Sequence, residues 1–308
     1  MSSEGAGFAS TDERADVAVI AVTYNSSTDI DPFISSLRAE GSGLRLRVIV
    51  ADNRSSDDTV DKLRRHGDVV VVDTGGNRGY AGGLNAAAEH VGAAASVLVL
   101  NPDLTVEPGS IGILVSALDQ AGLVVPKLLD DVDTVYTSLR REPSLSRALG
   151  DAVFGSRNPR RHPALSEIEL RPERYGESHE IEWATGAAVL IRQDVADLLG
   201  DWDERFFLYS EETDFFRRAR THGIRVVFEP AAVMRHSRGG SGSSAKLDAL
   251  MAVNRVRYVR KHHGVVYSTV FHGVVLVHEL ARSYSSRHRA ILRILMSPRR
   301  WRELCPAD

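Results

Sequence analysis

Four short apolar runs alternate with helix-like segments in the first half of the chain, and this alternation constrains the fold most strongly. The runs VAVIAV, LRVIVA, VVVV and VLVL begin at residues 17, 46, 69 and 97 and are rich in β-branched side chains. Helix-like segments separate them near residues 31–40, 56–67 and 81–90, and another begins at Pro108. Strands and helices that alternate in this way form parallel βαβ units. The sequence therefore predicts an α/β fold with a mostly parallel central sheet flanked by helices.

Polar side chains follow each of these runs. In parallel α/β sheets, ligands bind beyond the carboxyl ends of the strands, so Thr23, Asp52, Asn77 and Asp103 are expected at one sheet edge. The first run ends in TYNSS, which lacks the glycines of a dinucleotide-binding turn. The sequence thus disfavours a nicotinamide-dependent Rossmann enzyme, and the absence of a P-loop motif disfavours a kinase or ATPase.

Composition narrows the class further. The 308 residues are 43% hydrophobic and 26% charged, as expected for a soluble globular protein with one large core or a core plus a smaller region. A net charge of −3 argues against a globally basic nucleic-acid binder. The single cysteine, Cys305, excludes an intrachain disulfide and fits a reducing compartment. We expect no membrane-spanning segment, because no apolar stretch is long enough.

The second half is less regular at first. Residues 130–180 have the character of a variable insertion, and order returns with the expected strands IEWATGAAVLI (181–191) and IRVVFEP (224–230). The stretch HSRGGSGSS, which starts at His236, has the composition of a flexible loop. A helical region is expected from about Ala245.

The glycine-rich stretch GGNRGYAGGLN (75–85) permits close backbone approach to a ligand. Asn77 and Asn85 could then bind it by hydrogen bonds, and Arg78 could face a phosphate. The alternative is an ordinary glycine-rich turn from strand to helix. Asp52, directly at the end of a strand, could accept hydrogen bonds from a ribose or a base.

Asn101-Pro102-Asp103 reads first as a turn, because all three residues favour turns. Asp103 is nevertheless well placed to bind a hard cation. Mg²⁺ commonly takes one or two carboxylates together with phosphate oxygens. His236 is the candidate for a second metal or phosphate contact.

Three acids, Glu211, Glu212 and Asp214, stand at the expected start of a helix in SEETDFF. Favourable charge at the helix dipole explains one of them. Crowded carboxylates also raise one another's pKa, which suits a general base.

Six pieces of the chain, taken together and in order, resemble the family 2 inverting glycosyltransferases of the GT-A fold, and within them the rhamnosyltransferase-like bacterial members. The pieces are VAVIAVTYNSS, ADNRSSDDT, GGNRGYAGGLNAA, VLVLNPDLTVEPGSI, WATGAAVLIRQDV and GDWDERFFLYSEETDFFRRARTHGIRVVFEPAAVMRHSRGGS. The resemblance implies the GT-A fold and a role for each matching residue.

By this resemblance, the donor nucleotide is bound by Thr23, Tyr24, Asn25, Asp52, Asn77, Arg78, Gly79, Asn85, Asn101 and Asp103. Asp103 corresponds to the last acid of the family's Asp-x-Asp metal motif, Asn101 replaces the first, and His236 matches a histidine that can contact the metal. Trp183 and Gly186 shape the donor-sugar and acceptor pocket. Glu212 takes the position of the catalytic base, with Glu211 and Asp214 as alternatives.

The implied reaction moves a sugar from a nucleotide diphosphate to an acceptor hydroxyl, with inversion and with Mg²⁺ or Mn²⁺ on the diphosphate. The expected donor is dTDP-L-rhamnose, ahead of UDP-sugars and other dTDP-sugars. The acceptor is a saccharide, a polyprenyl-linked molecule or a small molecule. The alternatives are a soluble tailoring glycosyltransferase that acts on a natural product, a sugar-nucleotide-binding protein without turnover, and a sugar-nucleotide pyrophosphorylase.

We predict a disordered tail over residues 1–15, a GT-A domain over 16–244 and a helical extension over 245–308. The domain divides into a nucleotide-binding half, 16–125, and an acceptor and catalytic half, 126–244. Arg282–Arg302 combines arginines with apolar residues. It is expected either to bind an anionic membrane as a basic amphipathic helix or to pack back on the domain. We expect a cytoplasmic protein with no nucleic-acid partner. If this helix binds lipid, the protein lies at the cytoplasmic face of the membrane. The sequence leaves open whether it forms a homodimer.

Overall fold

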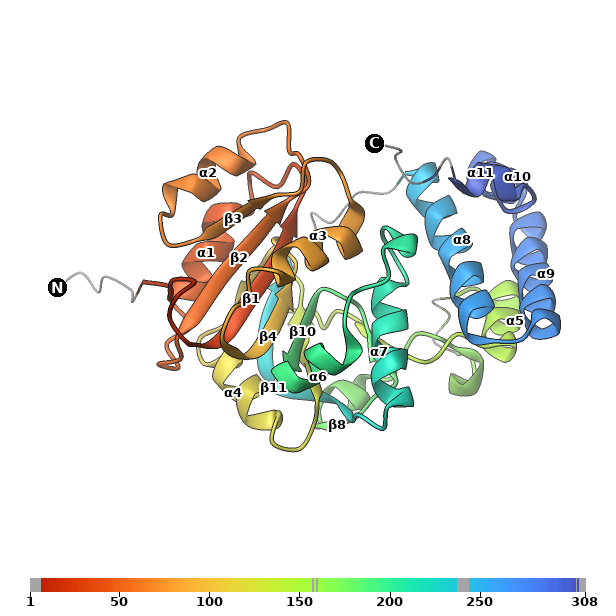
Figure 1. The fold of residues 1–308 in the computed structure, drawn as a ribbon. Coiled ribbons are helices and arrows are strands. Elements are labelled where there is room, and N and C mark those ends of the chain that lie inside the picture. The colour runs from red at the N-terminus through yellow and green to blue at the C-terminus, as the bar shows by residue number, and fades with distance from the viewer. Residues whose placement is uncertain (1–6, 157, 159, 237–243, 303, 305–308) are drawn as a thin grey trace.

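A mixed β-sheet forms the centre of the computed structural model, which describes residues 7–156, 158, 160–236, 244–302 and 304 (Figure 1). The strands are β1 (Ala15–Thr23), β2 (Leu46–Asp52), β3 (Val70–Asp73), β4 (Ala94–Leu100), β5 (Leu104–Val106), β6 (Leu123–Leu129), β7 (Leu139–Arg140), β8 (His179–Glu180), β9 (Trp183–Ala184), β10 (Ala188–Arg192) and β11 (Val226–His236). The large sheet has the order β3-β2-β1-β4-β10-β6-β11-β5, and β8 also pairs with β11. The predicted α/β class is confirmed.

The four predicted runs form the parallel part of this sheet. β1 pairs with β2 on one side and with β4 on the other, and β2 pairs with β3, all in parallel. Thr23 lies opposite Asp52, which lies opposite Asp73. The carboxyl ends of these strands therefore meet at one edge of the sheet, as predicted.

The second half of the sheet departs from the predicted strands. The expected strand 181–191 is two strands, because β9 pairs with β7 in a separate small sheet while β10 enters the large one. β10 runs antiparallel between β4 and β6. β6 was not expected, and β11 extends beyond residue 230 to His236 through an irregularity between Glu229 and Val233.

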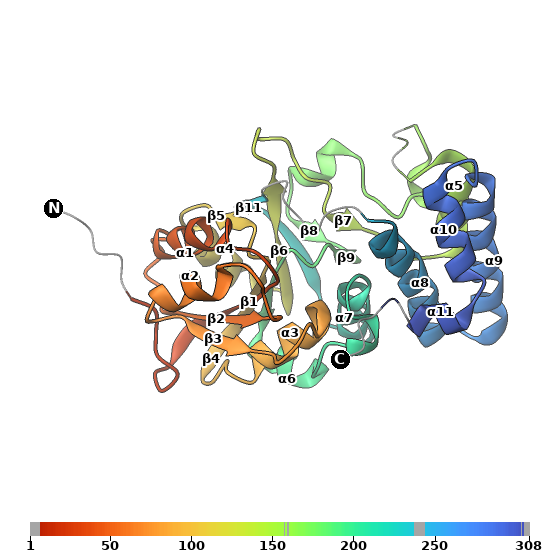
Figure 2. The ribbon, with the colours of Figure 1, turned by 90° about the horizontal axis from the view of Figure 1, so that it is seen from above.

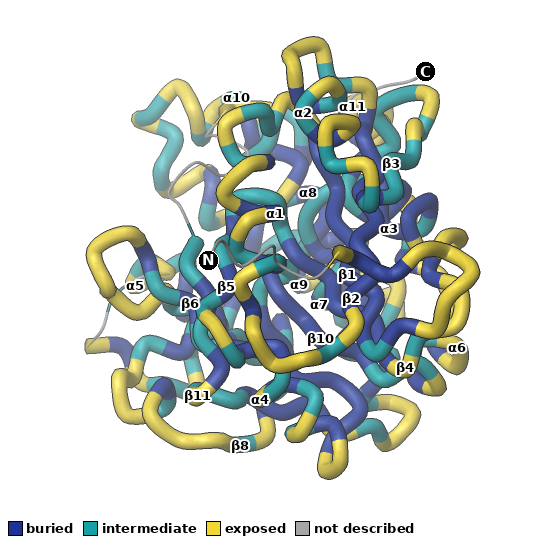
Figure 3. Tube along the Cα trace, turned by 90° about the vertical axis from the view of Figure 1, so that its left-hand side faces the viewer, coloured by how far each residue is buried: buried dark blue, intermediate teal, exposed yellow. Residues whose placement is uncertain are grey.

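Helices cover both faces of the sheet (Figures 1 and 3). The helices are α1 (Ile30–Arg38), α2 (Thr59–Arg65), α3 (Gly79–Ala88), α4 (Ser110–Ala117), α5 (Leu145–Phe154), α6 (Gln193–Leu199), α7 (Glu211–Thr221), α8 (Ala245–His262), α9 (Val265–Ala281), α10 (Ser286–Leu295) and α11 (Pro298–Arg302). α1, α2 and α4 share one hydrophobic core, and α3, α6 and α7 share the other. In β1, Val19 belongs to the first core and Ile20 to the second, because successive side chains of a strand point to opposite faces.

A third core holds a helical unit made of α5 and α8–α11. Figure 2 shows these helices together at the end of the molecule opposite to α1 and α2. α5 packs directly against α9, although it comes from the segment that we expected to be a variable insertion in the catalytic half. The helical unit is therefore not confined to the predicted extension after residue 244.

Two predicted features of the chain ends need correction. Phe8 and Ala9 are buried, Phe8 lies under the guanidinium of Arg38, and the Ala9 N–H donates to the Leu46 carbonyl at 2.7 Å. This part of the expected tail thus belongs to the fold, whereas residues 1–6 lie outside the described residues. So do residues 237–243, which make up most of the expected flexible loop, and Cys305.

The arginine-rich segment packs its apolar side chains inward. Ile291, Leu295 and Trp301 are buried in the core of the helical unit. The segment therefore packs back on the protein, which is the second of the two arrangements expected for it. Across the described ranges, no helix is long and apolar enough to cross a membrane.

Candidate active site

Asp103 and His236 meet at the carboxyl edge of the sheet. β5 follows Asp103 directly and pairs with β11 so that His236 lies opposite Leu104. This register brings the His236 Nε2 to 3.1 Å from a carboxylate oxygen of Asp103, and both side chains are mostly buried. Asp29 lies nearby, since its pKa is raised by burial and then by the charge of Asp103. Carboxylate oxygen and imidazole nitrogen are both ligands for divalent metals.

The second feature is the carboxylate pair at the start of α7. Burial raises the pKa of Glu212 to about 7, and it raises that of Glu211 well above its usual range, with a further contribution from Glu212. The Oε2 atom of each is buried without a hydrogen-bond partner among the described residues. A carboxylate that titrates near neutral pH and keeps an oxygen free for a ligand can act as a general base.

Tyr80 and Gly186 lie between the two features. The pKa of Tyr80 is raised well above its usual range by burial and then by the charges of Glu211, Glu212 and Asp103, which places all three near its hydroxyl. That hydroxyl donates to the Gly186 carbonyl at 3.0 Å. A Cβ at Gly186 would lie 3.2 Å from the Cβ of Glu212, so glycine permits this close approach. The sequence predicted Gly186 but missed Tyr80.

Arg140 and Tyr136 were also missed by the sequence analysis. The Arg140 guanidinium donates to the carbonyls of Thr137 and Leu139. Its charge acts to lower the pKa of Glu212. The Tyr136 ring packs edge-on against His236, with 5.4 Å between the ring centroids. The segment that joins β6 to β7 thus borders both the Asp103–His236 pair and the glutamate pair.

Asp214, the third candidate base, has a different environment. Its buried carboxylate accepts from Lys261 at 2.6 Å, from His262 at 2.7 Å and from Arg218 at 3.0 Å. Its pKa is lowered, because these hydrogen bonds outweigh its burial. Asp214 thus fastens α7 to α8, and its oxygens are already engaged.

The nucleotide-side candidates form a network at the ends of β1 and β2. Asp52 is buried and accepts from the Thr23 hydroxyl at 2.8 Å and from the Ser55 N–H at 2.8 Å. The Asn25 side chain accepts from the Ser56 N–H at 2.7 Å, with Asn25 in the left-handed region at a φ of 54°. Tyr24 stands exposed beside this network. The structure therefore brings these four candidates together.

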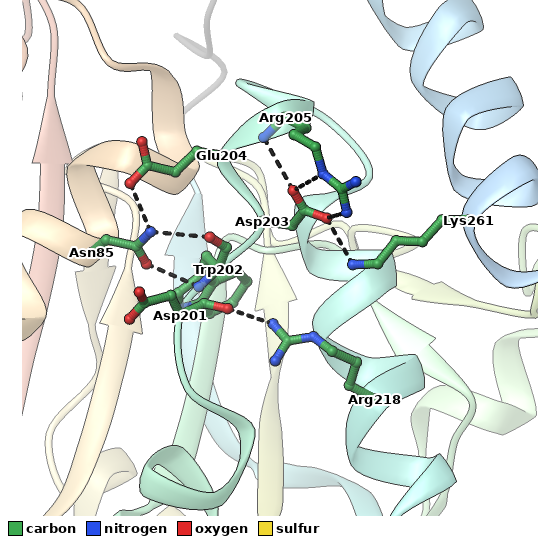
Figure 4. Close-up of a pocket in the computed structure, with 8 residues that line it drawn as sticks. All are labelled: Asn85, Asp201, Trp202, Asp203, Glu204, Arg205, Arg218 and Lys261. Atoms are coloured by element: carbon green, nitrogen blue, oxygen red, sulfur yellow. Dashed lines mark hydrogen bonds and ion pairs between the residues drawn. The ribbon is translucent and has the colours of Figure 1, made fainter.

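The glycine-rich stretch also contacts the loop of residues 201–209, which the sequence did not predict. Asn85 donates to the Trp202 carbonyl at 3.0 Å and accepts from its N–H at 2.9 Å, as Figure 4 shows. Arg78 pairs with Glu204 at 2.9 Å, and Asn77 accepts from the Gly79 N–H. Arg78 and Asn85 thus hold the loop of residues 201–209 against α3.

Gly79 makes the tightest of these contacts. It has a φ of 72°, and a Cβ there would overlap the carbonyl oxygen of Phe207. The Tyr80 N–H donates to that same oxygen at 2.6 Å. The loop can lie this close to α3 only because residue 79 is glycine.

The loop itself is conformationally strained. Phe207, Tyr209 and Ser210 all have positive φ, between 63° and 75°, and Ser210 directly precedes Glu211. Such backbone conformations persist only where the surroundings hold them, and they concentrate at functional sites. Here these three residues form the turn that leads into α7 and so set the orientation of Glu211 and Glu212.

An open hollow of about 530 Å³ lies beside this loop (Figure 4). Its lining consists of Asn85, Asp201, Trp202, Asp203, Glu204, Arg205, Arg218 and Lys261. The charged groups there pair with one another: Asp203 binds Arg205 at 2.5 Å and Lys261 at 2.7 Å. Asp103, Glu211 and Glu212 do not line it. The candidate catalytic and metal-binding carboxylates therefore lie outside this hollow.

Two other candidates have supporting positions. Trp183 is buried, and its indole N–H donates to the Arg141 carbonyl at 2.8 Å, so it supports the small β7–β9 sheet. The Asn101 N–H donates to the Ala187 carbonyl at 2.8 Å, and its own carbonyl accepts from the Leu104 N–H. Asn101 thus forms the turn that presents Asp103.

Comparison with known proteins bears on this arrangement. The family model described as "Glycosyl transferase family 2" matches residues 18–168. An N-acetylglucosaminyl-diphospho-decaprenol L-rhamnosyltransferase of Mycobacterium tuberculosis is 31% identical over 257 residues, which cover 78% of this chain and 82% of that protein. A low-salt glycan biosynthesis hexosyltransferase of Haloferax volcanii is 31% identical over 222 residues, which cover 68% of this chain and 64% of that protein.

Solved structures agree on the fold. A mannosyltransferase from Pyrobaculum calidifontis, in complex with GDP-Man and Mn²⁺, superimposes with a TM-score of 0.53 at 16% identity. The match covers 98% of this chain and 86% of that one. The predicted GT-A architecture is thus confirmed. The mycobacterial relative, 31% identical over 78% of this chain, and the matching family model show that this chain is a glycosyltransferase and belongs to glycosyl transferase family 2.

Proposed function

We propose that the enzyme transfers L-rhamnose from dTDP-L-rhamnose to a saccharide carried on a polyprenyl diphosphate, at the cytoplasmic face of a membrane. The mycobacterial relative, whose name states this sugar and a lipid-linked acceptor, supports both choices. The observation that carries the proposal is the glutamate pair at the start of α7. Its buried Oε2 atoms have no hydrogen-bond partner among the described residues, and its charges, with that of Asp103, raise the pKa of Tyr80.

Glu212 is the proposed base. Its pKa of about 7, raised by burial, lets it accept a proton from an acceptor hydroxyl near neutral pH. The hydroxyl oxygen then attacks the anomeric carbon from the face opposite the leaving diphosphate, so the configuration inverts in one displacement. As in inverting glycosidases, the attacking side needs one base and no protein nucleophile. Asp214 is unsuited to the role because Lys261, His262 and Arg218 already occupy its carboxylate.

A divalent metal fits the residues at the sheet edge. Asp103 supplies a carboxylate oxygen and His236 an imidazole nitrogen, 3.1 Å apart. The described part of the chain contains no group of three or more His, Cys, Asp or Glu that could hold a metal, so oxygens of the donor diphosphate and water would complete the ligand set. When bound, Mg²⁺ or Mn²⁺ would neutralise charge on the leaving diphosphate.

The donor and acceptor are tested together. Purified enzyme receives dTDP-L-rhamnose or UDP-GlcNAc, with a short-chain polyprenyl-diphosphate N-acetylglucosamine as the acceptor. We expect release of dTDP and a rhamnosylated lipid whose anomeric configuration, read by NMR, is opposite to that of the donor. Transfer only to water-soluble small molecules would identify a tailoring enzyme instead. Binding of the nucleotide without any product would identify a sugar-nucleotide-binding protein. Formation of dTTP and rhamnose 1-phosphate from dTDP-L-rhamnose and added pyrophosphate would identify a pyrophosphorylase.

The metal site has its own test. We expect Asp103→Ala to lower transfer by at least about a hundredfold, because the diphosphate charge is no longer met. In a thermal-shift assay, dTDP should stabilise the wild type more in the presence of Mn²⁺ than in its absence. His236→Gln should reduce that difference, whereas His222→Gln, an exposed histidine at the end of α7, should not. An unchanged metal response in His236→Gln would remove His236 from the site.

A further inference from the structure

One face of α9 exposes a continuous stripe of apolar side chains. This apolar stripe consists of Val266, Val270, Val277 and Leu280, whose spacing places them on one side of the helix. The exposed fraction is 80% at Val266, 59% at Val277 and 60% at Leu280. Phe271 and Val275, on the opposite side, are buried in the helical unit. The apolar stripe therefore stays exposed to solvent while the opposite side of α9 packs into the helical unit.

The neighbouring helix α5 adds to this surface. Leu149 and Val153, one turn apart, are exposed, and so is Phe154. α5 packs directly on α9, and the Arg282 guanidinium at the end of α9 donates to the carbonyls of Asp151 and Ala152. Two adjoining helices thus both expose large apolar side chains, and gathered apolar surface of this kind marks interaction sites.

Basic residues outnumber acids beside this surface, although Arg287 of α10 pairs with Asp248 of α8. Between residues 263 and 302 the only acid is Glu279, which is buried and pairs with His288 at 2.7 Å. Arg289 and Arg293 on α10 are exposed, as are the arginines of α11. Arg289 donates to the carbonyls of Ser283 and Tyr284, directly after the apolar stripe. Cations therefore stand beside the apolar surface with few acids to neutralise them.

We propose that the exposed faces of α5 and α9 rest on an anionic phospholipid bilayer, with the apolar stripe at the acyl boundary and the α10 arginines at the lipid phosphates. Apolar side chains flanked by exposed basic residues are the combination that interfacial membrane helices use. The surface differs from the amphipathic helix expected at Arg282–Arg302, because Ile291, Leu295 and Trp301 of that segment are buried in the core of the helical unit. Its purpose, access to a lipid-linked acceptor, rests on the proposed function.

The helical unit is also firmly connected to the catalytic pair. Lys261 and His262, at the end of α8, bind Asp214 in α7, three residues after Glu211. Asn254 of α8 donates to the carbonyl of Tyr209, which lies two residues before Glu211. A bilayer that seats α5 and α9 would therefore fix the orientation of the active site relative to the lipid surface.

The experiment is co-sedimentation of the full chain with large vesicles at low salt. We expect binding to equimolar phosphatidylglycerol and phosphatidylcholine, and little binding to phosphatidylcholine alone. Val277→Gln combined with Leu280→Gln should weaken the partition coefficient about tenfold. The matched control is Val132→Gln combined with Leu198→Gln, which removes a valine 70% exposed and a leucine 54% exposed away from the helical unit. The control should bind as the wild type does.

Charge is tested in the same assay. Arg289→Ala combined with Arg293→Ala should weaken binding to the anionic vesicles by at least about fivefold. Arg64→Ala combined with Arg65→Ala, on the exposed side of α2, should leave it unchanged. The stripe variant and the Arg289/Arg293 variant should both retain transfer to a water-soluble acceptor analogue, so loss of vesicle binding is separable from failure of the proposed function.

Three outcomes would overturn the proposal. They are absence of wild-type binding to anionic vesicles, equal binding by the stripe variant and its control, and a dimer in sedimentation velocity that the stripe substitutions dissociate. The third result would assign the stripe to contact between copies of this chain.

Discussion

Asn254 donates its side-chain amide to the carbonyl of Tyr209 at 3.0 Å, and the same nitrogen also reaches the carbonyls of Phe206 and Leu208 at 2.6 and 2.8 Å. One fully buried side chain of α8 thus binds three carbonyls of the strained loop that leads into Glu211. The loop is held from two sides, by Asn254 and by α3.

Substitutions of Asn254 should therefore affect both stability and catalysis. We expect Asn254→Ala to lower the free energy of unfolding by about 2 to 4 kcal/mol, because buried carbonyls lose their donor. Asn254→Asp should be worse, since a carboxylate of the same shape cannot donate to them. Urea denaturation and kcat, measured below the unfolding transition, check this order. Equal stability of the two variants would show that the amide acts only by its volume.

Glu212→Gln should lower transfer by at least about a hundredfold while nucleotide binding stays intact, because the variant cannot accept the acceptor proton. Glu211→Gln is the matched control, one residue away in the same turn of α7, and should be much less affected. Initial rates together with titration of dTDP binding separate the two effects. Near-normal turnover in Glu212→Gln would move the assignment to Glu211.

The transfer rate should depend on pH through the same carboxylate. Burial raises the pKa of Glu212 to about 7, so kcat/KM should fall as the pH drops below that value and the base becomes protonated. The Arg140 cation opposes this rise in pKa. Arg140→Gln should therefore shift the acidic limb of the profile to higher pH, and a shift in the other direction would contradict the placement of Arg140 beside the base.

Two glycines with similar backbone conformations allow the cost of backbone strain to be measured separately from the cost of a steric clash. Gly75 and Gly79 both have positive φ, 76° and 72°, but a Cβ at Gly75 meets nothing within 4 Å. Gly75→Ala should thus cost about 1 kcal/mol from the backbone alone. Gly79→Ala should cost about 3 kcal/mol or more and also reduce kcat, because the Phe207 carbonyl must move. Equal thermal stability of the two variants would disprove the close contact.

The sequence predicted the parts of the molecule that follow local patterns. The four apolar runs became neighbouring strands, and polar residues that end them, such as Thr23, Asp52 and Asp103, came to one edge because parallel strands share a direction. Glu211 and Glu212 were recognisable because their charge exceeds what a helix start requires.

The features that the sequence did not predict depend on contacts between segments far apart in the chain. Arg78 was expected at a phosphate, yet it pairs with Glu204, 126 residues later. Asn254 lies in an unremarkable helix, where no local pattern marks it, and only the path of the loop shows its partners. The prediction of one strand over 181–191 reads Gly186 as a glycine inside a strand, whereas residues 185–187 form a turn that separates β9 from β10.

The packing of α5 against α9 has a consequence for how the chain folds as it is synthesised. The sheet and its helices can assemble from a growing chain, since β1–β4 are close in sequence. α5 ends at residue 154, but its partner α9 ends only at residue 281. The apolar residues of α5 therefore stay without their packing partner until the C-terminal helices have been synthesised. A truncation after β11 would not yield a minimal enzyme; it would release a chain whose α5 never finds its partner and is prone to aggregate.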